Sequence, residues 1–236
     1  MKDQKKFLGI LGGMGPEATQ ILYHRIIDKT PAKNDQEHIP TLILSDTFIP
    51  DRTASILSHN TEDIFNKLLS DCLFLEKSGC SCIAISCNTA HYFADDLQEK
   101  LSIPILHMPR LTIKRIKENP KNKKIAIIAT DGTIKTGVYR KAIEAYGLIA
   151  FEPEEDIQKE VMHLIYDEIK KGEKGNPDTF AKIDKAIKDA GCDKAILGCT
   201  ELSVYKEYHE LSNMYIDSTD VLADECVKFF LHNYTE

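Results

Sequence analysis

Two cysteines, Cys87 and Cys199, are the residues of this sequence best placed to do chemistry. Each follows an apolar run, at 83–85 or 195–197, and each precedes small polar residues. Each also lies seven residues after the cysteine of a Gly-Cys pair, Cys80 in the first half and Cys192 in the second. An apolar run that ends in small polar residues is typical of a buried strand leading into a helix. We therefore predict two equivalent units, each presenting one thiol at the carboxyl end of a strand.

A thiol at such a junction is suited to proton transfer. Free backbone N–H groups and the positive end of a helix dipole favour thiolate over thiol. The pKa of each cysteine is therefore expected to fall from about 8.5 towards neutral. Two thiols facing one carbon atom from opposite sides could remove one proton and return another. Either cysteine alone could equally be packed in a core, and it is their matched placement that favours a functional role.

Strands and helices are expected to alternate along the whole chain. The strands should lie at 7–11, 39–44, 103–107, 125–129, 148–151 and 214–217, and at the two runs before Cys87 and Cys199. The basic stretch 114–124 is expected to be a solvated helix end and linker. The alternation predicts an α/β fold with two pseudo-symmetric Rossmann-like domains, each a mostly parallel sheet with helices on both faces. The active site is expected between the domains.

Length, charge and cysteine content exclude several classes of protein. A chain of 236 residues can bury the cores of two domains. Its net charge of −7 argues against nucleic acid or an anionic membrane as a partner. The charged beginning of the sequence and the shortness of its apolar runs predict neither a secretory signal nor a membrane span. The seven cysteines are therefore expected to be free thiols in the cytoplasm.

A dinucleotide site is one alternative to cysteine chemistry. The turn at 13–18 satisfies the pattern G-x-G-x-x-A directly after a predicted strand. The acidic residue expected about twenty positions further on is missing, since the first candidate, Asp46, lies 33 residues after Gly13. A nicotinamide cofactor would also leave the two matched cysteines unexplained. We therefore predict no bound cofactor.

A metal site is the second alternative, because Cys80, Cys82, Cys87 and His91 lie close together in the sequence. Their spacing matches no zinc-binding pattern, and a strand at about 3.3 Å per residue would separate Cys80 and Cys82 from Cys87. No metal is therefore predicted. The remaining cysteines are expected to be packed core thiols, namely Cys72, Cys80, Cys82, Cys192 and Cys226.

Five motifs give the sequence a resemblance to a known family. They are GGMGPEAT at 12–19, IPDRT at 49–53, SCNTAH at 86–91, ATDGT at 129–133 and LGCTEL at 197–202. Together and in this order they resemble the aspartate/glutamate racemases, and the IPDRT loop with a cysteine in both sites resembles the aspartate racemases in particular. The resemblance implies a PLP-independent transfer of the α-proton, in which one cysteine acts as thiolate and the other as thiol. It implies a small-molecule substrate, which is aspartate or, as the alternative, glutamate.

The resemblance also implies an organisation for the chain. Residues 1–107 together with 217–236 would form the N-terminal domain, since the family's last helix returns to it, and residues 108–216 would form the C-terminal domain. The family fold usually assembles as a homodimer. We carry both features over as expectations.

The same resemblance assigns substrate contacts. Arg52 and Lys170 are implied to bind the substrate's carboxylates, and the planar guanidinium of Arg52 suits a bidentate grip. Lys170 could instead complement the dipole of its helix end. The other implied contacts are donors close to the cysteines, which would stabilise charge on the α-carboxylate or could simply cap helices. These donors are Asn88, Thr89, Thr130, Thr133 and Thr200, and Met14 is implied as one more substrate contact.

Two departures from related racemases favour aspartate as the substrate. Glutamate racemases carry a histidine soon after the second cysteine, where this sequence has Glu201, and some broader relatives replace the first cysteine with threonine. His91 could share a helix face with Cys87 and tune it, or could cap or pack. A glutamate or broad-specificity acidic amino-acid racemase remains an alternative function, as does an α/β protein that binds a dicarboxylate without turning it over.

Overall fold

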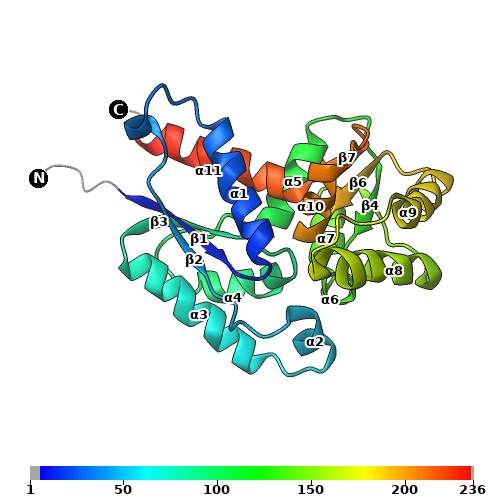
Figure 1. The fold of residues 1–236 in the computed structure, drawn as a ribbon, viewed down its shortest axis with the longest axis horizontal. Helices are drawn as coiled ribbons and strands as arrows, with labels where there is room; N and C mark the ends of the chain where they lie inside the picture. Colours follow the sequence, from blue (N-terminus) through cyan, green and yellow to red (C-terminus); the bar gives the residue numbers. More distant parts are fainter. Residues whose placement is uncertain (1–5, 235–236) are drawn as a thin grey trace, which may run out of the picture.

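The structure is a computed structural model that describes residues 6–234. Its strands form two separate sheets in which every pair is parallel (Figure 1). The first sheet has the order β2-β1-β3 and contains β1 Phe7–Gly12, β2 Thr41–Ser45 and β3 Cys80–Ile85. The second has the order β5-β4-β6-β7 and contains β4 Lys124–Ile128, β5 Ile149–Phe151, β6 Lys194–Leu197 and β7 Tyr215–Asp217. The predicted α/β class is confirmed.

Helices connect the strands throughout. The first half of the chain contributes α1 Pro16–Lys29, η1 Asp35–Glu37, α2 Arg52–Leu57, α3 Glu62–Lys77, η2 Thr89–Phe93, α4 Ala94–Gln98 and α5 Met108–Lys117. The second half contributes α6 Asp131–Thr136, α7 Val138–Ala145, α8 Glu155–Met162, η3 His163–Glu168, η4 Ile169–Lys171, α9 Pro177–Asp189, α10 Thr200–Tyr208 and α11 Ser218–Tyr234. None of the helices in residues 6–234 is long and apolar enough to cross a membrane.

Both faces of each sheet are covered, because successive strand residues point to opposite sides. In β1, Leu11 packs with α3, whereas its neighbour Ile10 packs with α1 and α11. In β4, Ile128 packs with α8 and α9, whereas Ile127 packs with α5 and α7. The strands are therefore fixed from both sides, and their carboxyl ends become rigid platforms for the residues that follow.

The last helix, α11, crosses back from the second sheet to the first. It begins directly after β7 and lies beside α1 and α5, with α1 blue and α11 red in Figure 1. Leu222 and Val227 of α11 join the core beneath β1, and Lys29 of α1 pairs with Asp224 at 2.9 Å. This helix ties the two halves together. The boundaries at 107/108 and 216/217 remain a prediction.

The structure corrects the expected strand at 103–107, which is reduced to a single bridge between Ile83 and Ile105. Two backbone N–H groups of this segment bond to side chains and not to a neighbouring strand. The N–H of Ile103 bonds to the carboxylate of Glu76, and the N–H of Ile105 bonds to the side chain of Gln98. Because proline between them has no N–H, too few donors remain to form a ladder.

The other differences are local. The predicted loop at 49–53 ends by starting α2 at Arg52, with Asp51 as its N-cap. The expected helix from 155 to 171 is continuous in position but changes from α-helical to π-helical at His163 and to a 3₁₀ turn at Ile169. Cys192 is only partly buried, whereas the other predicted core thiols, Cys72, Cys80, Cys82 and Cys226, are buried.

Candidate active site

The first cysteine lies just after β3. Every residue of β3 is buried, so the strand places Cys87 at a fixed point, where its side chain is 5 % exposed. Nδ1 of His91 donates to the backbone carbonyl of Cys87 at 2.8 Å, and Nε2 accepts the N–H of Met108 at 3.1 Å. His91 therefore holds the Cys87 backbone against the beginning of α5. Both ring nitrogens are used by backbone groups, which favours the packing role that was left open for this residue.

The second cysteine occupies the equivalent place in the other sheet. Cys199 lies just after β6 and is the N-cap residue of α10. It is 6 % exposed. Its thiol donates a hydrogen bond to Oε2 of Glu201, with 2.8 Å between the sulfur and oxygen atoms. The two cysteines thus have similar burial and different neighbours. The residue two places after Cys199 is the carboxylate Glu201, whereas the residue two places after Cys87 is the neutral Thr89.

A cavity between the two halves brings both cysteines together with the residues predicted to bind substrate. Every predicted site residue lines it except Thr133, whose hydroxyl lies 2.8 Å from that of Thr89. Three further residues line it as well: Thr53, Tyr166 and Glu201. The cavity has a volume of about 10 Å³, which is about the space that one water molecule needs. The site is therefore closed in this conformation.

Threonine hydroxyls from both halves meet at the back of the cavity. We call this group the hydroxyl cluster: Thr53, Thr89, Thr130 and Thr133. The distances between neighbouring hydroxyl oxygens range from 2.8 to 3.2 Å. Close approach of the halves requires Gly132, because a Cβ atom there would lie 2.8 Å from the Cα atom of Thr53. A hydroxyl can donate or accept, so this cluster could turn donors towards an anion.

Arg52 forms the wall on the Cys87 side. Its guanidinium donates to the backbone carbonyls of Met14 at 2.9 Å and Pro50 at 3.1 Å, which fixes its position. Its Nε and the side-chain nitrogen of Asn88 are buried and have no hydrogen-bond partner among the described residues. Burial lowers the pKa of Arg52, but the negative charges of Cys87, Asp51 and Glu201 outweigh it and raise that pKa. Two buried donors without acceptors suit a ligand that carries carboxylates.

Lys170 and Glu201 form the wall on the Cys199 side. Nζ of Lys170 lies 2.5 Å from Oε1 of Glu201, and the side chains are 23 % and 7 % exposed. Burial lowers the pKa of Lys170, and the charges of Glu201 and Cys199 raise it by more. The ammonium group also lies over the ring of Tyr166, 5.4 Å from its centre. The π-helical turn of η3 places Tyr166 and Lys170 at the cavity, and such turns are common at functional sites.

The expected lowering of thiol pKa is wrong for Cys199. Burial, which disfavours the thiolate, and the charge of Glu201 together raise its pKa well above the ordinary value, although Lys170 opposes them. The N-terminus of α10, which favours a thiolate, does not offset the rise in the pKa of Cys199 that burial and the neighbouring carboxylate cause. The sequence pattern alone assigns no role to Glu201. The only signal for it in the sequence was its place in the motif LGCTEL, and Tyr166 had no signal at all.

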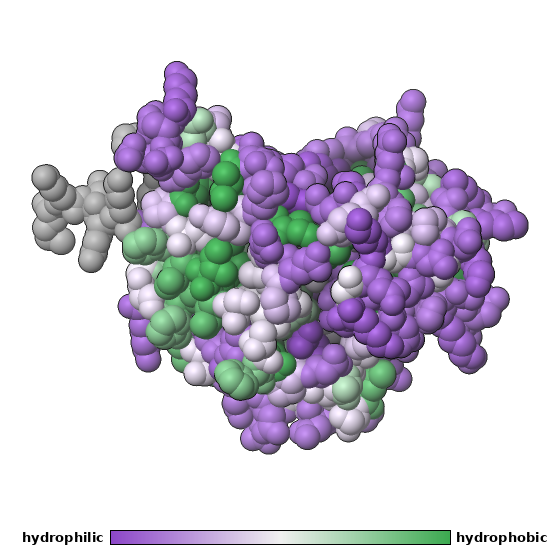
Figure 2. Space-filling view, viewed as in Figure 1, coloured by the Kyte–Doolittle hydropathy of each residue, from purple (hydrophilic) through white to green (hydrophobic). Residues whose placement is uncertain are grey.

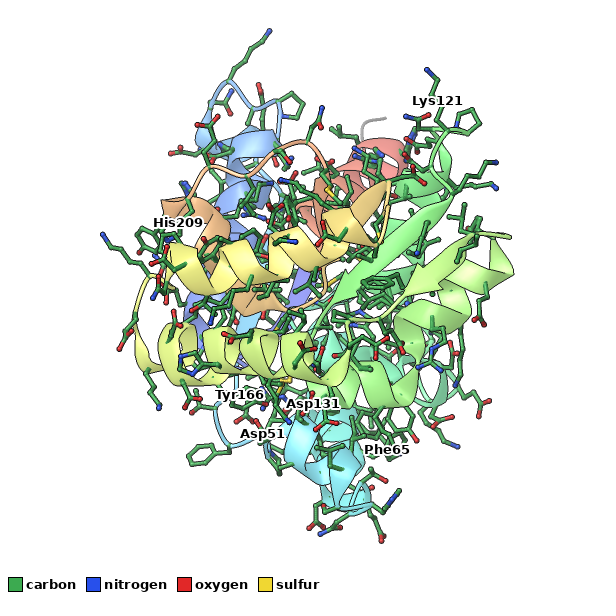
Figure 3. All side chains as sticks on the ribbon, turned by 90° about the vertical axis from the view of Figure 1, so that its right-hand side faces the viewer. Asp51, Phe65, Lys121, Asp131, Tyr166 and His209 are labelled. Carbon is green, nitrogen blue, oxygen red and sulfur yellow. The ribbon has the colours of Figure 1, made fainter. Side chains whose placement is uncertain are left out.

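A wider hollow lies outside the closed cavity. It has a volume of about 500 Å³ and shares Met14, Arg52, Lys170 and Glu201 with the cavity as a common wall. At its rim, the hydroxyl of Tyr166 donates to the carboxylate of Asp51 at 3.1 Å. Figure 3 shows these two side chains next to each other, one from each half. The hollow therefore borders the closed cavity directly.

Neither alternative site receives support from the geometry. Gly13 has a φ of +85°, and a Cβ atom there would lie 2.4 Å from the backbone of Asp46. Gly12 is equally confined, since a Cβ atom there would lie 2.3 Å from the Thr19 side chain, so close packing explains both glycines. Within residues 6–234, no three His, Cys, Asp or Glu side chains gather in a way that could hold a metal ion.

Comparison with known proteins supplies relatives of similar length. The chain is 28% identical over 230 residues to the broad specificity amino-acid racemase RacX of Bacillus subtilis, covering 95% of this chain and 98% of the relative. The solved structure of Picrophilus torridus aspartate racemase is 28% identical, with a TM-score of 0.76 over 95% of this chain and 94% of that one. A glutamate racemase from Bacillus anthracis shares the fold at 22% identity, with a TM-score of 0.68 over 98% of this chain and 84% of that one.

The match to a protein family also covers most of the chain. The pattern of the family described as Asp/Glu/Hydantoin racemase covers residues 11–226, which include both cysteines and every predicted site residue. The resemblance inferred from the five motifs is therefore confirmed. This chain belongs to the Asp/Glu/Hydantoin racemase family, and so to the isomerases.

Proposed function

We propose that the chain interconverts L- and D-aspartate without a cofactor, with Cys87 and Cys199 as its two bases. The observation that carries the proposal is that thiols from two separate sheets reach one cavity that also contains Arg52 and Lys170. Two cationic side chains suit a substrate with two carboxylates. The likeness to a solved aspartate racemase over 95% of the chain supports the same substrate.

In the proposed reaction one cysteine acts as thiolate and takes the α-proton, and the other delivers a proton to the opposite face of the same carbon. Negative charge then grows on the α-carboxylate. The hydroxyl cluster and the free amide donor of Asn88 can stabilise that charge in a cavity that excludes water. The reverse reaction needs only the opposite protonation states of Cys87 and Cys199.

Substrate entry requires the site to open. A cavity of about 10 Å³ is far too small for aspartate, so the wall formed by Met14, Arg52, Lys170 and Glu201 has to move. The hydrogen bond between Asp51 and Tyr166 would then close the rim over bound substrate. Closure removes water from the reacting atoms and brings both thiols within reach of Cα.

A broad-specificity racemase is the second candidate, because the Bacillus subtilis relative carries that name. Glutamate is longer than aspartate by one methylene, which by itself is worth only about 1–3 kcal/mol of discrimination. Comparing kcat/KM for aspartate, glutamate and a neutral amino acid separates the candidates. We expect aspartate to be fastest, and similar rates for all three would favour the broader function.

The deciding experiment is to incubate the pure protein with L-aspartate in D₂O and to analyse both enantiomers by mass spectrometry. We expect D-aspartate with deuterium at Cα, since the second thiol delivers a solvent-derived proton. The double variant Cys87→Ala/Cys199→Ala serves as the control and should form none. Binding of L-aspartate without turnover by the wild type would instead identify a dicarboxylate-binding protein.

Assembly and location belong to the same proposal. Hydrophobic side chains gather over the first half of the molecule, whereas the second half presents a mostly hydrophilic face (Figure 2). The edge strand β2 contributes Ile43, which is 39% exposed. An open edge strand with apolar residues favours pairing with a second copy, and sedimentation should detect a homodimer. The seven free cysteines support the cytoplasm as the compartment.

A further inference from the structure

Glu201 stands where the first half has a neutral residue. It lies two residues after Cys199, and Thr89 lies two residues after Cys87. Oε2 of Glu201 is 2.8 Å from the sulfur atom of Cys199, with the thiol as donor. A thiolate has no proton to donate, so this hydrogen bond exists only while Cys199 is protonated. The contact therefore distinguishes between the two protonation states of Cys199.

Lys170 fixes Glu201 in this position. It binds Oε1 at 2.5 Å, which leaves Oε2 for Cys199, and the hydroxyl of Thr200 lies 3.4 Å from Oε2. Glu201 is 5 % exposed, so water does not compete for its oxygens. The groups whose charges act on Cys199 are Glu201 on its own helix, Lys170 on η4 and, more weakly, Tyr139 on α7. Glu201 is the negative one, and it is in direct contact.

The surroundings of Cys87 carry the opposite charge. The cation of Arg52 is its charged neighbour: burial lowers the pKa of Arg52, and the charge of Cys87 is foremost among the effects that raise it. Thr89 directs its hydroxyl to Thr133. A nearby cation stabilises a thiolate, and a nearby carboxylate stabilises a thiol. The two halves are therefore similar in backbone and opposite in electrostatics.

We propose that Glu201, held by Lys170, is a positioning residue that keeps the proton on Cys199 in the resting enzyme. This inference rests on the proposed two-cysteine reaction and adds the starting roles: Cys87 begins as the base and Cys199 as the acid. The C–H bond at Cα breaks as the proton moves to the sulfur of Cys87. The S–H bond of Cys199 then breaks as its proton moves to the other face of Cα.

This first turnover leaves a thiol at Cys87 and a thiolate at Cys199 beside the carboxylate of Glu201. Like charges in contact make that form the less stable of the two. It is the form that accepts the opposite enantiomer, and otherwise it returns to the resting form by exchanging protons with solvent. Glu201 thus sets which enantiomer the resting enzyme is ready to use, without changing the equilibrium between the enantiomers.

The test measures thiol reactivity and does not depend on racemase activity. Full-length protein is treated briefly with iodoacetamide at about pH 7.5, and the labelling of each cysteine is followed by peptide mass spectrometry. Because Cys87 and Cys199 line one cavity, the ratio of their rates cancels the effect of site opening. In the wild type, Cys87 should react first. In Glu201→Gln, the rate for Cys199 relative to Cys87 should rise by roughly tenfold or more, as expected for at least one unit of pKa.

An increase in the labelling of one cysteine is not what a damaged fold would produce. Cys72 and Cys226 are buried elsewhere in the chain and report unfolding if they react too. If Glu201→Gln is unfolded by this criterion, Lys170→Met provides the test. Loss of the cation should lower the rate of labelling of Cys199 relative to that of Cys87. The inference is overturned if Glu201→Gln leaves the ratio unchanged in folded protein, or if Lys170→Met fails to lower it. Absence of aspartate turnover with the expected labelling ratios would reject the proposed substrate and keep the role of Glu201.

Discussion

The two halves of the site occupy equivalent places in two sheets and differ in the residues that follow each cysteine. Asn88 and Thr89 follow Cys87, whereas Thr200 and Glu201 follow Cys199. The first pair joins the halves: the hydroxyl of Tyr139 donates to Asn88 at 2.5 Å, and Thr89 belongs to the hydroxyl cluster. The second pair surrounds the thiol with a carboxylate. The repeated backbone supplies symmetric positions for two bases, and the side chains make those bases unequal.

The fourth residue after each cysteine also has an equivalent position and a different side chain in the two halves. His91 ties the Cys87 segment to the backbone of Met108. Ser203 ties the Cys199 segment to β7 and α11, through bonds of 2.7 Å to Asp217 and 2.8 Å to Thr219. Both side chains are buried, and both fix the turn that carries a thiol. Only the first of them is titratable, and burial lowers the pKa of His91 to about 3, so the ring stays neutral in the fold at mildly acidic pH.

The largest expected effect comes from removing either thiol. Cys87→Ser and Cys199→Ser should each lower racemisation of aspartate by about a thousandfold or more, because an alcohol is a far weaker acid and base at neutral pH. Both cysteines are needed in either direction of the reaction, because one removes the α-proton and the other delivers a new one. Cys192→Ser is the matched control, since this cysteine is only partly buried and lies outside the cavity. Enantiomer analysis by chiral chromatography measures all three, and near-wild-type turnover by either active-site variant would refute the two-base reaction.

The sequence predicts much of this comparison, because its evidence is local. Apolar runs give the strands, and their repetition before Cys87 and Cys199 gives the equivalence of the halves. The pairing of Glu201 with Lys170 joins residues 31 positions apart, and spacing alone does not reveal it. The failed strand at 103–107 has the same origin, since Glu76 and Gln98 take the donors that a ladder needs. Contacts made by side chains across the fold decide what local patterns leave open.

The next effect concerns the cation beside Cys87. Arg52→Lys keeps the charge but loses the planar fork that bonds the carbonyls of Met14 and Pro50. It also removes the buried Nε that has no partner among the described residues. We expect kcat/KM for aspartate to fall by about a hundredfold. The matched control is Arg140→Lys, which changes an exposed pair with Glu152 and should leave kcat/KM unchanged. Equal activity of the Arg52 variant and the wild type would show that a cation beside Cys87 is enough and that the planar fork is not needed.

Stability at low pH should distinguish His91 from its counterpart Ser203. Burial, with His107 beside it, lowers the pKa of His91 to about 3. Below the unfolded value of about 6.5 the unfolded chain takes up a proton that the folded His91 does not, so stability is lost as the pH falls. Between about pH 6.5 and 5 this loss amounts to about 2 kcal/mol of unfolding free energy.

Urea unfolding of the wild type and His91→Gln at both pH values measures this contribution. Glutamine keeps a donor and an acceptor but does not titrate, so the variant should lose about 2 kcal/mol less than the wild type over this range. Ser203→Ala should shift stability equally at both pH values, because serine has no titration there. Parallel curves for the wild type and His91→Gln would show that His91 is not held neutral in the fold.

The smallest effect is expected at the rim, where the halves touch through one exposed bond. Tyr166→Phe removes the hydroxyl that donates to Asp51 and keeps the ring beneath Lys170. A hydrogen bond in reach of water is worth about 1 kcal/mol or less, so KM should rise by roughly twofold to fivefold while kcat changes little. Tyr146→Phe, at an exposed tyrosine outside the cavity, is the control. Since Asp51 also caps α2 by accepting the N–H of Ala54 at 2.7 Å, changing the tyrosine tests the rim contact alone. If KM is unaltered, closure depends on the hydroxyl cluster inside the cavity, whose contacts join Thr53 and Thr89 of one half to Thr130 and Thr133 of the other.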